Sequence, residues 1–375
     1  MKQSEINASL LEYFATLSDH RVNRRKRHHL LDIIAIAICS VISGGDGPTD
    51  MELYGKAKRD WLESFLELPN GIPSHDTFGR FFAALDPHAF HRCFLGWITA
   101  IAQLTEGRLV AIDGKTLRGS ADTAAGTPPL HMVSAWAEAN RLMLAQRAVD
   151  GRSNEITAIP ELLEMLWLNG AIVTIDAIGT QKTIAQAIRD KQGDYVLALK
   201  QNHPLLYQQT VALFDEHLAT AERFAPTAVD QQTDAGHGRV EVRRCWSLAV
   251  ADRWAVAAEW AGLQSVAMIE RERHIGTEKR VERSYYLTSL PPVAATIAAA
   301  VRAHWSIENQ LHWVLDVTFA EDASRIRVAN AVENLTLLRK IALNLLAQEP
   351  SKGSIKGKRK RAGWDNDFLR RVLSS

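Results

Sequence analysis

The chain has 375 residues, of which 46% are hydrophobic and 23% charged, and its formal net charge is +1. This length allows two or three domains with a sizeable core, and the composition is that of an ordinary soluble protein. The overall charge excludes a uniformly basic protein, so a nucleic-acid partner would have to be bound through local clusters of charge.

The cysteines and the apolar segments indicate the compartment. Cys39, Cys93 and Cys245 are odd in number, far apart and without metal-ligand spacing, which fits a reducing compartment. The longest apolar run, Ile33 to Ile42, is too short to span a bilayer. The N-terminal segment contains acids and lacks the apolar core of a signal peptide. We therefore expect a cytoplasmic protein.

Residues 1–105 are predicted to form a mostly helical N-terminal domain. Ser74 is a plausible N-cap of a short helix that carries His75, Thr77 and Arg80. A turn leading into such a helix could be a helix-turn-helix reader of DNA, although any small helical domain contains similar turns. The basic segment at residues 21–29 could contact phosphates or could be a solvated loop.

Residues 106–204 have the pattern of an α/β domain. A β-rich run ends at Asp113, and the segments HMVSAWAE and RLMLAQRAV indicate a β-hairpin. A helix ended by Gly170, a buried strand ending at Asp176, a helix ended by Gly193 and a strand stopped by Pro204 follow. This order of three strands, helix, strand, helix and strand predicts a mixed sheet.

The rest of the chain divides into three segments. Residues 205–290 contain one predicted helix and several alternating stretches typical of antiparallel strands, and we interpret them as a β-rich insertion. Residues 291–348 are predicted to be helical and to complete the α/β core. Residues 349–375 form a basic tail with six Lys and Arg residues between Lys352 and Arg361.

A helix with an unusual acid is predicted within residues 301–327. Its apolar residues recur at intervals of three and four, and Glu308 lies in this pattern with His304 and His312 four residues to either side. An acid on an apolar face is costly unless a metal, a basic neighbour or a catalytic role compensates its charge. The simpler alternative is a capped or salt-bridged glutamate on a core helix. The apolar residues are Val301, Trp305, Ile307, Leu311, Trp313 and Leu315.

Two strands end in the same way. Val110–Gly114 and Val173–Ala177 are β-branched runs that end in Asp113 and Asp176, each followed by a small residue that would let a ligand approach. A single aspartate there is commonly a turn-former or a helix cap. Clustered carboxylates raise one another's pKa unless a cation lies between them. Hard oxygen ligands suit Mg²⁺ or Mn²⁺, and two such ions about 3.5–4 Å apart can activate a nucleophile on a phosphodiester.

The order of these segments, with Glu308 beyond the insertion, resembles an RNase H-like DDE transposase core. More specifically, the chain resembles the ISAs-type insertion-sequence transposases and the H-repeat-associated proteins of Rhs elements. The resemblance covers about residues 19–345. Its most specific strings are IDGKTLRGS and HWSIENQLHW, and SNEITAIPELL, TIDAIGTQK and DYVLALKQNH also match.

The resemblance implies that Asp113, Asp176 and Glu308 are the DDE triad that holds two Mg²⁺ or Mn²⁺ ions. It also implies a set of neighbours that position DNA phosphates, namely Lys115, Arg118, Gln181, Lys200, Asn202, Arg302, His304, Asn309 and His312.

The sequence departs from related patterns at two places. In the broader transposase signature, Val301, His304 and Leu315 replace a tyrosine, an arginine and a lysine, although the histidine form is expected in the closer family. Gln201 and His203 occur where relatives usually have glycine and glutamine, which affects the details of that loop.

Other kinds of site fit less well. A haloacid-dehalogenase phosphatase would need an aspartate at Ala111. A zinc site shared by His304 and His312 is excluded because eight residues of helix span roughly 12 Å. Three further acids compete with Glu308 as third ligand, namely Asp316, Glu321 and Asp322.

We therefore expect a Mg²⁺-dependent enzyme that cleaves DNA at the ends of an insertion element and joins the freed 3′-hydroxyl to target DNA. Its expected partners are double-stranded terminal-repeat and target DNA and, in the DNA complex, a second copy of the chain. The expected location is the cytoplasm, at the nucleoid. A catalytically idle DNA-binding relic of a mobile element and an RNase H-fold nuclease without strand transfer remain alternatives.

Overall fold

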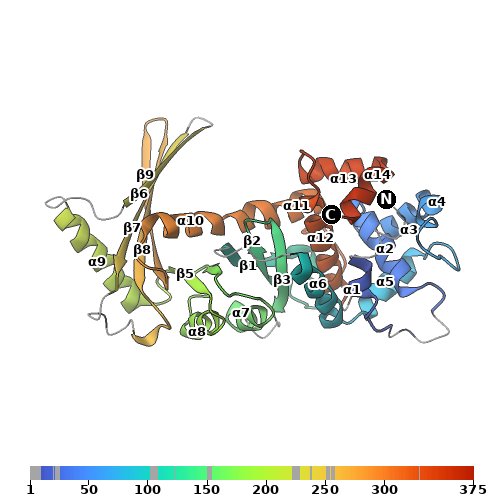
Figure 1. Cartoon of the computed structure of the whole chain (residues 1–375), viewed down its shortest axis with the longest axis horizontal. Coiled ribbons are helices and arrows are strands. Elements are labelled where there is room, and N and C mark those ends of the chain that lie inside the picture. The colour runs from blue at the N-terminus through green and yellow to red at the C-terminus, as the bar shows by residue number, and fades with distance from the viewer. Residues whose placement is uncertain are drawn as a thin grey trace.

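The computed structural model describes residues 10–19, 21, 26–101, 109–122, 124–149, 154–221, 229–236, 239–250, 254, 258–328 and 330–375. The molecule is elongated, with helices from both ends of the chain at one extremity and long strands at the other (Figure 1). Four of the nine residues in the basic segment at residues 21–29, residues 22–25, lie outside the described residues.

One mixed sheet runs through the molecule in the order β3-β2-β1-β4-β5-β9-β8-β7-β6. The pairs β1–β4 and β4–β5 are parallel, and the other neighbours are antiparallel. The predicted mixed α/β architecture is thus confirmed. The strands are β1 (Leu109–Leu117), β2 (Leu130–Ala137), β3 (Leu142–Val149), β4 (Ile172–Ile175), β5 (Asp194–Leu199), β6 (Val229–Gly236), β7 (Arg239–Ala249), β8 (Ser265–Ile275) and β9 (Glu278–Thr288).

Helices cover both faces of the first five strands. The crossover helices α7 (Glu155–Glu164) and α8 (Lys182–Asp190) lie on one side, whereas α10 (Ala294–His304) crosses the other (Figure 1). Helix α7 begins at Asn154, whose side chain accepts a hydrogen bond from the Ile156 N–H. These helices bury an apolar stripe against the sheet, as the helical spacing predicts.

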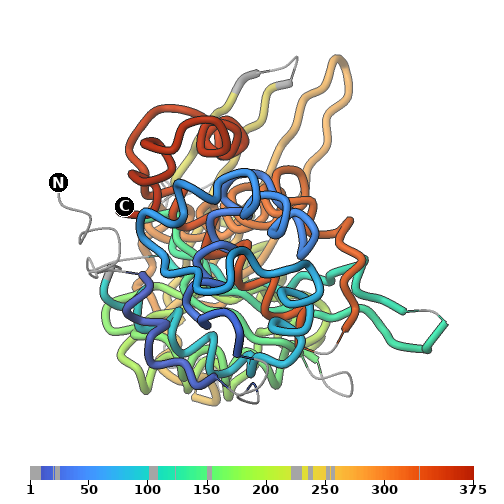
Figure 2. The backbone as a smooth tube through the Cα atoms, turned by 90° about the vertical axis from the view of Figure 1, so that its right-hand side faces the viewer, coloured from blue at the N-terminus to red at the C-terminus, as the bar shows by residue number. Residues whose placement is uncertain are grey.

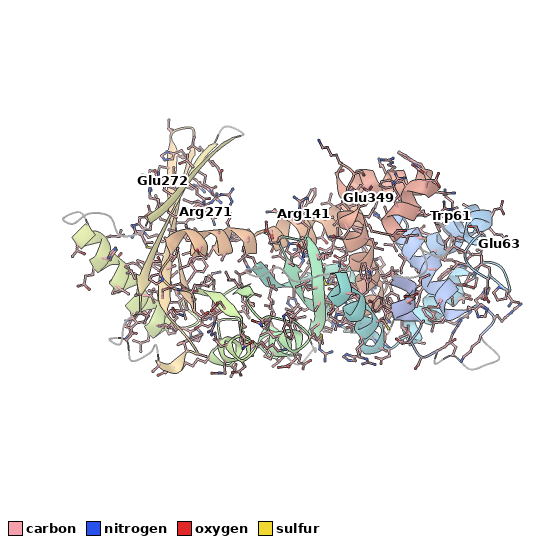
Figure 3. The ribbon with its side chains drawn as sticks, viewed as in Figure 1. Trp61, Glu63, Arg141, Arg271, Glu272 and Glu349 are labelled. Atoms are coloured by element: carbon pink, nitrogen blue, oxygen red, sulfur yellow. The ribbon has the colours of Figure 1, made fainter. Side chains whose placement is uncertain are left out.

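Residues 205–290 extend the core sheet. Strand β9 pairs with β5, so helix α9 (Pro204–Ala221) and strands β6 to β9 continue the core rather than forming a separate sheet. The two hairpins β6–β7 and β8–β9 rise beyond the body of the molecule, and we call them the arms (Figure 2). Their outer halves are rich in Arg and Glu. The first residues of β9 are exposed, whereas Arg271 and Glu272 on β8 are half-buried (Figure 3).

The N-terminal helices and the C-terminal helices pack together around α12 (Ala331–Gln348), most of which is buried. The predicted N-cap is present, because Ser74 accepts a hydrogen bond from the Thr77 N–H. The basic tail also folds, as two helices. These helices are α1 (Leu10–Phe14), α2 (Leu30–Ile42), α3 (Pro48–Ala57), α4 (Arg59–Leu62), α5 (His75–Ala84), α6 (Pro87–Ile101), α13 (Ile355–Trp364) and α14 (Asn366–Leu373).

The structure shows the state of the three cysteines and the apolar character of the described helices. Cys39, Cys93 and Cys245 are all buried and free of disulfides. In the described part of the chain, no helix combines the length and the apolar character needed to cross a membrane.

Candidate active site

The sheet register brings Asp113 and Asp176 together. Strand β1 runs parallel to β4 with Ile112 opposite Ile175, so the two aspartates are the next residues along neighbouring strands. Neighbouring strands lie about 4.8 Å apart, which places the backbones that carry these acids side by side. Asp113 is still within β1, whereas Asp176 follows the last residue of the shorter β4.

Glu308 reaches this edge from a different element. Helix α10 ends at His304, and a π-helix at Ile307–His312 precedes α11 (Trp313–Phe319). A π-helix has i→i+5 hydrogen bonds, and such segments are frequent at functional sites. Glu308 is in its first turn and exposed, and His312 at its end is buried with Nε2 3.3 Å from Asp113 Oδ2.

The electrostatics of the three acids indicate mutual proximity. Burial and the charges of Glu155 and Asp113 raise the pKa of Asp176. Glu308 is exposed as a residue, but partial burial of its carboxylate and the neighbouring Asp113 carboxylate likewise raise its pKa. Burial alone would raise the pKa of Asp113 too, but His312, His304 and the Gly114 N–H together outweigh it, so the net shift is downward. Close carboxylates of this kind are relieved when a cation binds between them.

The two histidines lie behind the carboxylates. His304 Nδ1 is 3.0 Å from the hydroxyl of Thr174 on β4, and burial lowers its pKa. Among the described residues, neither ring nitrogen of His312 has a hydrogen-bond partner of normal geometry. The resemblance implied that both rings position DNA phosphates, which stays a prediction; in the structure they contact Thr174 on β4 and Asp113 on β1.

Lys115 is already engaged by two of the acids that compete with Glu308. Its ammonium group forms ion pairs with Asp316 and with Glu321, the latter at 2.8 Å, and its side chain is only 12% exposed. Glu321 is itself buried, and Asp322 lies 4.0 Å from the same ammonium group. These three acids therefore hold β1 to α11 and to the segment after it, and Glu308 is the acid next to Asp113.

The loop after β5 supports the loop that carries Asp176. Asn202 donates a 2.6 Å hydrogen bond to the Ala177 carbonyl, and His203 Nε2 is 2.6 Å from the Thr180 carbonyl oxygen. Gln181 donates to the Ile178 carbonyl at 3.4 Å, and the Lys200 side chain is exposed beside them. His203, one of the departures from the relatives, thus has a structural role in this loop.

The other predicted DNA-contact residues lie farther out. The side chain of Arg118 is 85% exposed, and its Nε is 3.9 Å from Asp322. Arg302 and Asn309 line a cavity of about 730 Å³ between α10, the π-helix and the arms. Arg302 forms an ion pair with Asp234 at 3.2 Å. The cavity is rich in arginine and also contains Trp305, which lies 5.7 Å from the Arg271 guanidinium carbon, measured to the ring centre.

Comparison with known proteins identifies the family of this chain. The family model described as "Transposase DDE domain" matches residues 104–345, well over half of the chain, and the model described as "DDE_Tnp_1-associated" matches residues 11–98. The chain belongs to the transposase DDE domain family.

Relatives in this family span the whole chain. "Putative transposase YncI" of Escherichia coli O157:H7 is 38% identical over 98% of this chain and 95% of its own length. "H repeat-associated putative transposase YhhI" of Escherichia coli (strain K12) is 36% identical over 97% of each. A piggyBac transposase in a synaptic complex with hairpin DNA gives a TM-score of 0.41 at 11% identity, over 100% of this chain and 79% of that one, too low to carry an argument.

The donor set of this DDE-family site suits a hard divalent cation. In the described residues, no three His, Cys, Asp or Glu side chains are grouped closely enough to hold an ion as they stand. Asp113, Asp176 and Glu308 nevertheless supply carboxylate oxygens from three elements at one sheet edge, and the buried His312 lies 3.3 Å from Asp113. Such oxygen ligands fit Mg²⁺ or Mn²⁺.

The sequence alone did not identify two residues beside the site. His131 on β2 and Glu155 on α7 form an ion pair at 2.7 Å, and a Cβ at Gly114 would clash with both side chains. The glycine after Asp113 thus makes room for protein side chains, whereas the sequence suggested room for a ligand. Glu155 falls within the matched string SNEITAIPELL, but its spacing gives no sign of this position.

Proposed function

We propose that the protein is a DDE transposase that cleaves DNA at the ends of an insertion element and transfers the freed strands to target DNA. One observation carries the proposal: acids from β1, from the end of β4 and from the π-helix meet at one edge of an α/β sheet. The family assignment supports the same conclusion. We further propose that the first five strands form an RNase H-like core.

Asp113, Asp176 and Glu308 would hold two Mg²⁺ or Mn²⁺ ions. When bound, such ions polarise a phosphodiester and lower the pKa of the attacking water or 3′-hydroxyl. The protein's own residues keep the ligands in place. His312 orients Asp113, and the contacts of Asn202 and His203 support the Asp176 loop.

Double-stranded DNA, both terminal repeats and target, is the proposed partner. The exposed Arg118 and Lys200, with Gln181, flank the acids and would contact phosphates there. Arg302 and Asn309 would contact DNA that enters the cavity below the arms. Lys115, which is engaged by carboxylates, is assigned a positioning role instead.

Each segment of the chain has a proposed role. Residues 1–105 would bind DNA through α5, where Arg80 is exposed. Residues 106–204 and 291–348 would form the catalytic core, residues 205–290 would extend it, and residues 349–375 would bind back onto the N-terminal helices. We propose that two copies assemble on the DNA, in the cytoplasm at the nucleoid.

The test is cleavage and joining of terminal-repeat DNA by Asp113→Asn and Glu308→Gln variants in Mg²⁺. Each change removes a ligand charge at nearly constant volume, and we expect cleavage to slow by on the order of 10³-fold. Asp190→Asn, on the exposed end of α8, is the matched control and should cleave normally. Full activity in either site variant would contradict the assignment.

The reaction products distinguish a transposase from a nuclease and from an idle DNA-binding relic. Joined strands support a transposase, and cleavage without a joined product would indicate a nuclease. DNA binding without nicking in any divalent cation would indicate an idle relic.

A further inference from the structure

A histidine and a glutamate lie on the opposite side of β1 from Glu308. Side chains alternate along a strand, so Asp113 and Lys115 face the π-helix and α11, whereas Gly114 and Thr116 lie on the side of His131 and Glu155. On that second face His131 Nδ1 is 2.9 Å from Thr116 Oγ1, and its Nε2 is 2.7 Å from Glu155 Oε1. The three groups form a chain of contacts along β1.

The start of helix α7 places Glu155 at this position. It occupies the first turn of α7, where the helix dipole favours an acid, and Asn154 caps the same turn. The missing side chain of Gly114 lets the Glu155 carboxylate and the His131 ring pack against β1 at the residue that follows Asp113. If Glu155 served only as a salt-bridged acid at the start of α7, it would need neither the space that Gly114 leaves nor a position beside β1.

The Glu155 carboxylate lies beside the backbone that carries Asp113. A Cβ built on Gly114, the residue after Asp113, would clash with Glu155 Oε1. The side chain of Glu155 is only 13% exposed, so its charge is weakly screened by solvent. A negative charge held among other carboxylates is costly unless a cation compensates it.

We propose that Glu155 is a fourth carboxylate of the cation site, positioned by His131 and by the space that Gly114 leaves. Asp113 and Asp176 would then lie between Glu308 on one face of the sheet and Glu155 on the other, which provides acids on both sides for two ions. The inference rests on the proposed function, because it concerns the same site.

The experiment measures Mn²⁺ binding by the full-length protein without DNA, from the loss of the free Mn²⁺ signal in electron paramagnetic resonance. Glu155→Gln keeps the volume but removes the charge, and we expect binding to weaken by about 10- to 100-fold. Glu161→Gln on the same helix, whose carboxylate is exposed and paired with Arg147, is the control and should bind normally.

Two further variants separate binding from folding. Gly114→Ala keeps every acid but displaces Glu155 and His131, and it should weaken Mn²⁺ binding in the same direction. His131→Gln removes the positioning ring and should weaken binding less than Glu155→Gln does. Circular dichroism must show a native fold in each variant used.

The outcomes distinguish the inference from the proposed function. Normal Mn²⁺ binding by Glu155→Gln, with weakened binding by Asp113→Asn, would overturn the role of Glu155 and leave the three-acid site standing. An unmodified protein that binds no Mn²⁺ would overturn both. Weakened binding by Glu155→Gln and Gly114→Ala, with Glu161→Gln unchanged, would establish the fourth carboxylate.

Discussion

His91 on α6 is a buried titratable residue away from the active site. Its Nε2 accepts a hydrogen bond from the Gln146 N–H on β3 at 3.2 Å, which requires a neutral acceptor nitrogen. Burial lowers the pKa of His91 to about 3, and the charges of Lys340 and Arg147 act in the same direction. The folded protein therefore keeps this ring neutral over a pH range in which the unfolded chain protonates it.

This linkage predicts how stability depends on pH. Because the unfolded chain takes up the proton first, the contribution of His91 is complete above pH 6.5 and declines as the pH falls towards 3. The decline is up to about 1.4 kcal/mol per pH unit. In His91→Gln, which retains an acceptor, the free energy of unfolding in urea should fall less between pH 7 and pH 5 than in the unmodified protein. Equal slopes in the two proteins would contradict the prediction.

At the scale of elements, the outer edge of β3 is covered by side chains from α12. Asn344 both accepts from the Met143 N–H and donates to the Met143 carbonyl, each at 2.9 Å, and Gln348 donates to the Asn140 carbonyl. An uncovered edge strand would leave these backbone groups without partners. The helix therefore completes the sheet at the side next to the N-terminal domain.

Asn344→Leu should destabilise the protein by about 2–4 kcal/mol, because it leaves a buried N–H and a buried carbonyl unpaired. The urea midpoint should fall accordingly. Gln348→Leu, at the partly buried end of the helix, is the control and should cost less than about 1 kcal/mol. Equal urea midpoints for Asn344→Leu and Gln348→Leu would show that the hydrogen bonds of Asn344 do not stabilise the edge of β3.

The strands and helices that carry the acids could be predicted because local periodicity and turn residues determine them. The π-helix could not, because the helical spacing assumed a constant period through residues 301–315. Trp305 and Trp313, on either side of the π-helix, are 50% and 58% exposed, while Ile307 and Leu311 within it are buried. The pairing of β5 with β9 is a long-range contact that no local pattern specifies.

At the scale of the whole molecule, Arg359 on α13 joins distant parts of the chain. Its guanidinium donates to the carbonyls of Val41 at 3.0 Å and Gly45 at 3.2 Å, and to that of Thr318. It also lies over the Phe319 ring, 4.3 Å from its centre. A cation at the ends of α2 and α11 satisfies helix C-terminal carbonyls, so part of the basic tail is structural.

We expect Arg359→Met to lower stability by about 2–4 kcal/mol, since three backbone carbonyls lose a charged donor. Thermal unfolding is the measurement, and Lys360→Met, which removes an exposed charge from the same helix, is the control. Equal melting temperatures for the two variants would show that the tail is not held by this residue.

The continuity of the sheet has a mechanical consequence. The arms lead through β9 into β5, and β5 leads directly into the loop whose Asn202 bonds the backbone beside Asp176. Because hydrogen-bonded strands move together, a force on the arms is transmitted along β5 to the loop that follows Asp176. A force applied to the arms therefore also acts on the sheet edge that carries Asp113 and Asp176.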